Sequence, residues 1–320
     1  MKHRKVVVSK HGGPEVLQVT EEPLPEPGPG KIRVRVETTG VSAYDLMMRA
    51  SGIFPGMPKV PFTLGEDLVG VADALGEGAK GIELGHRVGA WTFGRGGTYA
   101  EHVCIEDWEA VPVPDGLPSS KAVCLVVNYL TAYAAMHVAA KVQEGERVLI
   151  HGAAGGVGSA LLHLGRLAGL QMYGTASAKN QEIVASLGAT PIDYRGEDFV
   201  ARVREETSAG VDVVFDPVGG NRQVRRSYRA LKPGGRLLWF GMAATKTHGL
   251  RAIPATMAAL AWLKLRPRGR AVILMENLDK VAARDGWYRA VMTEVFAHGA
   301  SGEIDPLVAA SFPLEEAAVA

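Results

Sequence analysis

The chain has 320 residues, enough for two domains of ordinary size with buried cores, which excludes a minimal binding module. Its 35 basic and 34 acidic residues leave a formal charge of +1, so no field of one sign attracts nucleic acid or an anionic membrane. Two cysteines, Cys104 and Cys124, are too few for a disulfide framework and are typical of a reducing compartment, so we expect a cytoplasmic protein.

No stretch of the sequence predicts a membrane span. The longest apolar-rich stretch, Ala252–Leu265, is about half as long as a spanning helix requires, and it contains Pro254 and Lys264. The N-terminal MKHRKVVVSK is basic, but its three valines are too few for the apolar region of a signal peptide. We therefore expect a small-molecule ligand, no nucleic-acid partner and no membrane span.

Residues 1–124 predict an all-β domain with irregular loops. Short alternating or β-branched runs, such as KVVVSK, KIRVRVETTG and EDLVGVADAL, are separated by turns rich in glycine and proline. In the second run Ile32, Val34 and Val36 alternate with charged residues, so one face of that strand is expected to be exposed to solvent and the other buried. Such a strand does not belong to a parallel sheet covered on both faces.

Residues 125–266 predict a doubly wound parallel sheet. Five apolar runs, RVLIHG, LQMYGTA, TPIDY, VDVVFD and RLLWFG, alternate with amphipathic helical segments over 157–168, 179–187, 198–207 and 222–231. Beyond them, AVILMEN and a helix over 286–298 supply too few elements to fold alone. We therefore predict that 267–320 rejoins the first domain.

The segment VLIHGAAGGVGSALLHLGRLAG predicts a dinucleotide phosphate cradle. A buried strand leads into Gly152, Gly155, Gly156 and Gly158, and a helix of good formers follows. Glycines there permit the tight turn, bring backbone N–H groups to a pyrophosphate and let the helix pack on the strand. Ala153 departs from the strict glycine spacing, and a merely structural turn is the alternative.

The end of the second strand indicates NADPH rather than NADH. An NAD site usually has an acidic residue there, which holds the ribose 2′-hydroxyl. This chain has GTASAK instead, in which Lys179 would attract a 2′-phosphate. The alternative is that Lys179 is only a solvated lysine at the start of a helix.

The sequence resembles the medium-chain dehydrogenase/reductase superfamily, in its zinc-free quinone oxidoreductase branch. The motifs LVVNYLTAYAAM, HGAAGGVG, GTASAKNQ, PIDYRGED, DPVGG and KPGGRLLWFGMA look especially like those of vesicle amine transport protein homologues. The resemblance implies a GroES-like β-barrel domain made of 1–124 and 267–320, with a Rossmann domain over 125–266 inserted into it. It also implies a homodimer, formed through the edge of the nucleotide-domain sheet, which RLLWFG would supply.

The same resemblance carries cofactor positions onto this chain. It implies Thr131 near the nicotinamide, the pyrophosphate at Gly155, Gly156 and Val157, the 2′-phosphate at Ser177, Lys179 and Tyr194, and the nicotinamide ribose at Gly241 and Met242. Tyr194 lies at the end of the next predicted strand, where its phenol could reach the same phosphate. A half-buried tyrosine without a ligand is the alternative.

Both zinc-ligand positions of the superfamily are replaced, by Ser42 in GVSAYD and Glu66 in GED, so we expect no metal. Without a Lewis acid, the acceptor should already be activated by conjugation. Candidate catalytic residues are Ser42, Tyr44, Asp45 and Thr131. Many quinone reductases of the family have a tyrosine where this chain has Met47, and related enoyl-thioester reductases have a tyrosine before a proline where this chain has Phe54. No dedicated proton donor is therefore identified. For Asp45, a role in capping the loop is favoured.

The hypothesis is an NADPH-dependent, zinc-independent reductase of quinones or α,β-unsaturated carbonyl compounds. One alternative is an enoyl-thioester reductase. Another is an NADPH-binding protein with a mainly lipid- or partner-binding role.

Overall fold

The computed structural model describes residues 1–51, 58–241, 243–245, 249–266 and 269–320. The chain forms two compact units, Met1–Leu130 with Ala282–Ala320, and Thr131–Val281. The second unit is inserted into the first along the sequence. Its boundaries fall somewhat later in the chain than the positions 124/125 and 266/267 expected from the sequence.

The second unit is built on a parallel sheet, as the alternation of apolar runs and helices predicts. Among the described residues this sheet has six strands in the order β11-β10-β9-β12-β13-β14, which is the 3-2-1-4-5-6 order of dinucleotide-binding sheets. The strands are β9 (Arg147–His151), β10 (Gln171–Ala176), β11 (Thr190–Asp193), β12 (Val211–Asp216), β13 (Leu231–Trp239) and β14 (Ala271–Leu274). The chain direction across the sheet reverses between β9 and β12, and ligands of such sheets bind at that point.

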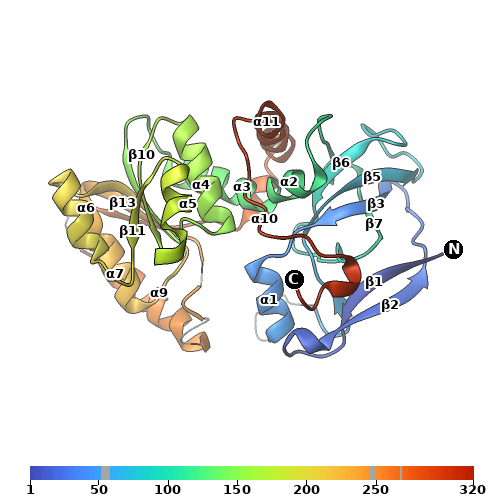
Figure 1. The fold of residues 1–320 in the computed structure, drawn as a ribbon, viewed down its shortest axis with the longest axis horizontal. Coiled ribbons are helices and arrows are strands. Elements are labelled where there is room, and N and C mark those ends of the chain that lie inside the picture. Colours follow the sequence, from blue (N-terminus) through green and yellow to red (C-terminus); the bar gives the residue numbers. More distant parts are fainter. Residues whose placement is uncertain (52–57, 242, 246–248, 267–268) are drawn as a thin grey trace. The chain divides into compact units, whose positions relative to one another are not determined.

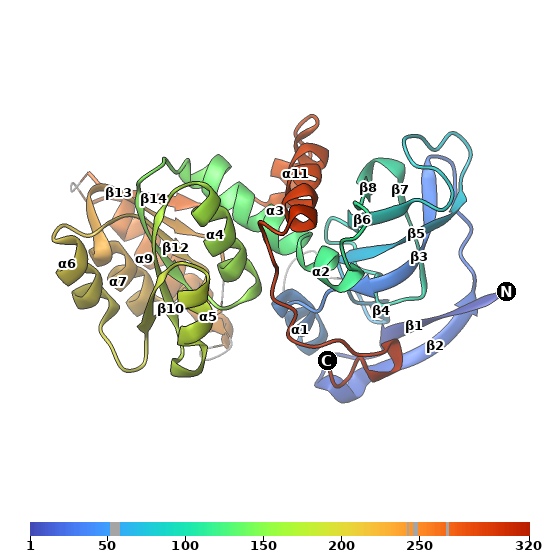
Figure 2. The same cartoon turned by 45° about the horizontal axis from the view of Figure 1, so that its top comes forward.

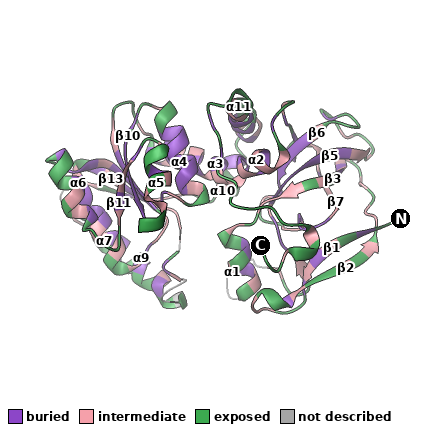
Figure 3. Cartoon of the chain, viewed as in Figure 1, coloured by how far each residue is buried: buried purple, intermediate pink, exposed green. Residues whose placement is uncertain are grey.

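Helices cover both faces of this sheet (Figures 1 and 2). One face carries α4 (Gly156–Leu167) and α5 (Gln181–Ser186); the other carries α6 (Phe199–Thr207), α7 (Asn221–Ala230) and α9 (Ala252–Lys264). Figure 3 shows the buried residues concentrated on the strands and on the inner faces of these helices. Phe199, Tyr228 and Leu260 join the sheet residues in one core cluster, which fixes α7 against the sheet.

The position of β14 corrects two expectations. AVILMEN was expected to rejoin the first domain, but β14 pairs with β13, from Arg236 opposite Ala271 to Trp239 opposite Leu274. The first four residues of RLLWFG form the last part of β13, which pairs with β12 on one side and β14 on the other, so this segment is an inner strand and not the sheet edge expected for a dimer. A strand of four residues without alternation of apolar and polar side chains does not indicate to which sheet it belongs. Its position is determined by tertiary pairing.

The first unit contains two antiparallel sheets, with strand orders β2-β1-β4 and β7-β3-β5-β6-β8. Their strands are β1 (Lys2–Val8), β2 (Leu17–Pro23), β3 (Lys31–Thr39), β4 (Phe62–Thr63), β5 (Asp67–Leu75), β6 (Arg87–Trp91), β7 (His102–Glu106) and β8 (Val111–Pro112). In β3, Ile32 and Val34 are fully buried, as the alternation predicts. The long helix α11 (Trp287–Ser301) belongs to this unit: the Tyr288 hydroxyl donates to the Glu109 carbonyl at 2.8 Å.

The expectation of an all-β first domain was wrong in two places. Helix α1 (Ala43–Ala50) stands where a loop was expected, and α2 (Ser119–Cys124) closes the segment. A capping box starts α1: the Asp45 backbone N–H donates to Ser42 Oγ at 3.3 Å, and the Ser42 N–H donates to Asp45 Oδ2 at 2.8 Å. Satisfying these otherwise unpaired groups stabilises a short helix.

Helix α2 continues through α3 (Val127–Tyr133) into a π-helical segment, Ala134–Ala140. Among the described residues, Ser119–Ala140 is the one helical run long and apolar enough to cross a membrane, and 56% of its apolar 18-residue window is buried in the structure. The apolar stretch singled out from the sequence forms the shorter α9 instead. The short helix α10 (Leu278–Ala282) completes the elements between β14 and α11.

Candidate functional site

A cavity of about 620 Å³ opens in the second unit at the carboxyl ends of the parallel strands. It is lined from four strand ends and from the start of α7, which is the location expected for the ligand of a doubly wound sheet. Its lining residues are His151, Gly152, Thr175, Tyr194, Phe199, Val218, Gly219, Gly220, Asn221, Arg222, Gln223, Arg226, Ala243 and Ala244. No aspartate or glutamate occurs among these described lining residues.

The glycine-rich turn leads from β9 into α4. Gly152 follows the strand with φ +66°, a conformation that favours glycine, and it lines the cavity. Gly155 is the N-cap of α4, and Gly156 and the half-buried Val157 open the helix. A Cβ on Gly158 would overlap the Gly152 carbonyl oxygen, so only glycine lets the helix approach the turn this closely. The free N–H groups of the first helical turn are available to an anion there.

The ends of β10 and β11 hold the residues expected around a 2′-phosphate. Tyr194 is 48% exposed and lines the cavity, with the Arg195 guanidinium 5.6 Å from its ring centroid. Ser177 is half-buried and Lys179 is exposed, and neither is among the lining residues. The structure thus places Tyr194, but not Lys179, on the cavity wall.

A buried hydrogen-bond chain that the sequence reasoning missed begins at the cavity wall, at His151 and Thr175. Ser227 Oγ donates to Asp216 Oδ2 at 2.7 Å, so it accepts from His151 Nε2–H at 3.1 Å. The other ring nitrogen, Nδ1, then accepts from Thr175 Oγ1 at 2.9 Å. Burial lowers the pKa of His151, in keeping with the neutral ring that this chain requires. A histidine ending the apolar run VLIH was the available signal.

Asp216 extends the chain to the loop before α7. Its Oδ1 accepts from the backbone N–H groups of Val218 at 2.8 Å and Gly219 at 3.0 Å. The Gly220 N–H donates to Thr256 Oγ1 at 2.6 Å. These bonds fix the loop at the start of α7 relative to the strands, and so they position the side chains of its first turn.

The remaining cofactor positions lie elsewhere in this unit. Gly241 follows β13, where a Cβ would meet the Pro217 backbone, and it is half-buried. Met242 lies outside the described residues. Thr131 is half-buried in α3. Neither Gly241 nor Thr131 is among the described residues that line the cavity.

The other catalytic candidates, Ser42, Tyr44 and Asp45, lie at the start of α1 in the first unit. Asp45 is buried; its carboxylate accepts from Ser42 N–H at 2.8 Å, Ser42 Oγ at 2.7 Å and Gly65 N–H at 2.9 Å. Burial raises its pKa and these bonds oppose the rise. Tyr44 is 40% exposed, and its pKa is raised first by burial and then by the charges of Glu66 and Asp45. The geometry makes Asp45 a helix cap and leaves Tyr44 partly exposed.

Two further carboxyls follow Gly65. Burial, with the charges of Asp45 and Asp67, raises the pKa of Glu66 to about 8, and burial raises that of Asp67 to about 7. Cys104 and Cys124 are free and half-buried, and burial raises the pKa of each thiol. The described residues contain no group of three or more His, Cys, Asp or Glu side chains placed to hold a metal ion.

Comparisons with known proteins agree with this architecture. Residues 28–115 match the alcohol dehydrogenase GroES-like domain, and residues 156–273 match the family described as zinc-binding dehydrogenase. The synaptic vesicle membrane protein VAT-1 homolog of Rattus norvegicus is 34% identical over 98% of this chain and 79% of its own length. The chain belongs to the medium-chain dehydrogenase/reductase superfamily. It lies in the zinc-free, quinone oxidoreductase-like branch, close to the VAT-1 homologues.

Solved structures of this superfamily carry the same fold. A quinone oxidoreductase from Pseudomonas syringae superposes with a TM-score of 0.84 at 28% identity, over 99% of this chain and 94% of that one. A mycobacterial protein solved in complex with NADPH gives a TM-score of 0.83 at 28% identity, with the same coverage. The expected architecture, a GroES-like domain with a Rossmann domain, is therefore confirmed, and the protein is an oxidoreductase of the medium-chain superfamily.

Proposed function

We propose that this medium-chain reductase uses NADPH, without zinc, to reduce quinones or α,β-unsaturated carbonyl compounds. The observation that carries the proposal is the cavity at the carboxyl ends of the strands. Its described lining includes the cations Arg222 and Arg226 and the phenol of Tyr194, with no carboxylate. Such a lining favours a phosphate-bearing ligand and would not repel a 2′-phosphate.

The glycine turn supports the same cofactor. Gly152, Gly155 and Gly156 are exposed, so the backbone of the turn is open to a ligand. The N-terminus of α4, with its positive dipole end and free N–H groups, suits a pyrophosphate. The close approach of Gly158 to Gly152 holds the helix in position. In our proposal Gly155, Gly156 and Val157 bind the pyrophosphate, and Tyr194, Ser177 and Lys179 surround the 2′-phosphate.

When bound, the nicotinamide supplies the hydride, and the residues of this chain position the acceptor and deliver a proton. Tyr44 is protonated at neutral pH, since the ordinary tyrosine pKa is near 10 and burial raises it further, and the residue is 40% exposed. Asp45 accepts two hydrogen bonds from Ser42, which hold the start of α1, and a third from the Gly65 N–H. We therefore assign proton donation to the Tyr44 hydroxyl or to water, and positioning to Ser42 and Asp45. Thr131, Gly241 and Met242 remain proposed contacts of the nicotinamide half.

Acceptors activated by conjugation fit this proposal because no metal is needed to polarise them. Two free cysteines are compatible with the cytoplasmic, reducing location that we propose. The test is NADPH oxidation by the purified protein, followed by absorbance, with a panel of quinones, enones and enoyl thioesters. We expect turnover with quinones or enones that is unchanged by a strong zinc chelator.

Two results would contradict this proposal. Turnover confined to enoyl thioesters would favour the enoyl-thioester reductase alternative. Tight NADPH binding with no turnover of any acceptor would favour a binding protein, and co-sedimentation with liposomes would then test a lipid-binding role.

A further inference from the structure

The cations of the cavity come from α7 and not from the expected position at the end of β10. Lys179 is exposed and is not among the lining residues, whereas Arg222 and Arg226 both are. The spacing of the sequence predicts a 2′-phosphate contact from a lysine that follows the second strand. The structure offers two guanidinium groups on another element instead.

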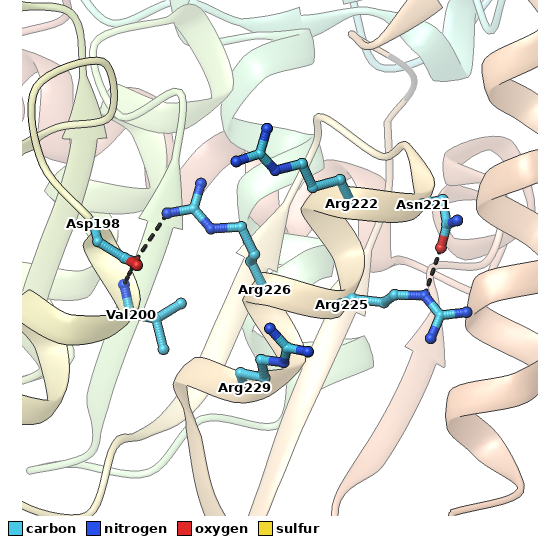
Figure 4. Close-up of a pocket in the computed structure, with 7 residues that line it drawn as sticks. All are labelled: Asp198, Val200, Asn221, Arg222, Arg225, Arg226 and Arg229. Atoms are coloured by element: carbon cyan, nitrogen blue, oxygen red, sulfur yellow. Dashed lines mark hydrogen bonds and ion pairs between the residues drawn. The ribbon is translucent and has the colours of Figure 1, made fainter.

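Arg226 already has partners of its own. Its guanidinium forms an ion pair with Asp198 at 2.9 Å and lies 4.3 Å from the centroid of the Phe199 ring. Arg225, on the same helix, donates to Asn221 Oδ1 at 2.6 Å and stacks over the Trp262 ring at 4.1 Å. Figure 4 shows both hydrogen-bonded contacts as dashed lines. These two arginines are therefore part of the structure of α7 and its neighbours.

Arg222 differs from both. It lies in the first turn of α7, it is exposed, and within the described part of the chain no hydrogen bond or ion pair of its side chain is found. In Figure 4 its guanidinium extends from the helix without a dashed line to any neighbour. An arginine that has no partner among the described residues, at the wall of a cavity whose described lining contains no carboxylate, is available to an anionic ligand.

A second cavity increases the positive charge around Arg222. It has a volume of about 530 Å³ and shares Asn221, Arg222 and Arg226 with the first cavity. Its other arginines are Arg225 and Arg229, and the one carboxylate among its described lining residues, Asp198, is already paired with Arg226. The shared rim is therefore strongly positive, and the N-terminal end of the α7 dipole adds to this.

We propose that Arg222 binds the 2′-phosphate of NADPH, together with Tyr194, and is a determinant of the preference for NADPH over NADH. The inference rests on the proposed function, because it assumes that the cavity holds the adenosine end of that cofactor. Tyr194 lines the same cavity from the end of β11, so a phenol hydroxyl and a guanidinium are both offered to one ligand. The chain of hydrogen bonds from His151 through Ser227 to Asp216 fixes the loop that precedes Arg222.

The test is calorimetric titration of the full chain with two probes, 2′,5′-ADP and 5′-AMP, which differ only in the 2′-phosphate. Removing a charged hydrogen-bond donor from a phosphate should weaken 2′,5′-ADP binding by about tenfold or more in Arg222→Gln. Binding of 5′-AMP should change by less than about twofold, because its phosphate lies elsewhere. Arg222→Lys, which keeps the charge but not the forked geometry, should fall between wild type and Arg222→Gln.

Arg229→Gln is the matched control, since Arg229 is on the same helix and exposed but lines only the second cavity. It should bind both probes as the wild type does. The inference is overturned if Arg222→Gln binds 2′,5′-ADP normally, or if both probes weaken equally, which would place Arg222 against the adenosine. A wild-type protein that binds the two probes equally would instead contradict the proposed function itself.

Discussion

At the scale of single residues, Glu66 shows how burial makes a carboxyl sensitive to pH. Its pKa is raised from 4.5 to about 8 by burial and by two neighbouring carboxyls, Asp45 and Asp67. The folded state therefore binds this proton more tightly than the unfolded state does. The corresponding stabilisation is fully present below about pH 4.5 and is lost as the pH rises through about 8.

Glu66→Gln should remove much of this pH dependence, because a neutral amide does not ionise. Urea unfolding at pH 5 and pH 9 should show a smaller loss of unfolding free energy for the variant, with a difference of about 1.4 kcal/mol or more, equivalent to one pKa unit. Glu77→Gln, at an exposed position, is the control and should behave as the wild type. Identical loss in Glu66→Gln and wild type would show that Glu66 titrates normally.

Other site residues could be predicted from the sequence only where a local rule applied. Gly152 was identified because a glycine turn between a strand and a helix has a recognisable spacing, and Tyr194 because the family resemblance implied it; both line the cavity. Arg222 and His151 were missed. Their importance depends on which side chains meet across separate strands and helices, and no spacing rule encodes that.

At the scale of elements, the strongly periodic βα segments of the second unit were predictable, and α4, α6 and α7 lie within a few residues of the expected ranges. Helix α1 was not, although the Ser42-to-Asp45 capping signature is present in the sequence. Its eight residues lie in a chain segment dominated by β patterns, so the signature was interpreted as a loop. Strand β14 was misplaced because its four residues are held by pairing with β13.

The packing of α4 on the glycine turn gives a sharp test. Gly158→Ala should force the helix away from Gly152, since the added methyl would overlap the carbonyl oxygen. We expect destabilisation of about 1–3 kcal/mol, as for overpacked interiors, with loss of NADPH binding in a fluorescence titration. Gly28→Ala, where a Cβ meets open space, should change neither property. Normal NADPH binding by Gly158→Ala would contradict the role of this turn.

For the whole molecule, the order of the strands determines which sheet edge a second copy of the chain can pair with. The proposed homodimer through the nucleotide-domain sheet would have to use β14 as its edge on that side, because β13 is covered. Ala271 is exposed on β14, and a lysine there would discourage strand pairing.

Light scattering should give a mass of about 68 kDa for the wild type, twice the chain mass of 34.0 kDa, and the monomer mass for Ala271→Lys. Ala201→Lys, on the exposed face of α6, should remain dimeric. A dimeric Ala271→Lys protein would exclude this edge, and a wild type that is monomeric at all concentrations would exclude the dimer.

The doubly wound unit, Thr131–Val281, is the part of the chain that we propose binds NADPH. The most direct measurement is a fluorescence titration of the wild-type protein with NADPH and with NADH under the same salt conditions. Because the described lining of the cavity carries cations and no carboxylate, we expect NADPH to bind at least about tenfold more tightly than NADH. Equal affinity, or tighter binding of NADH, would show that this unit does not select NADPH.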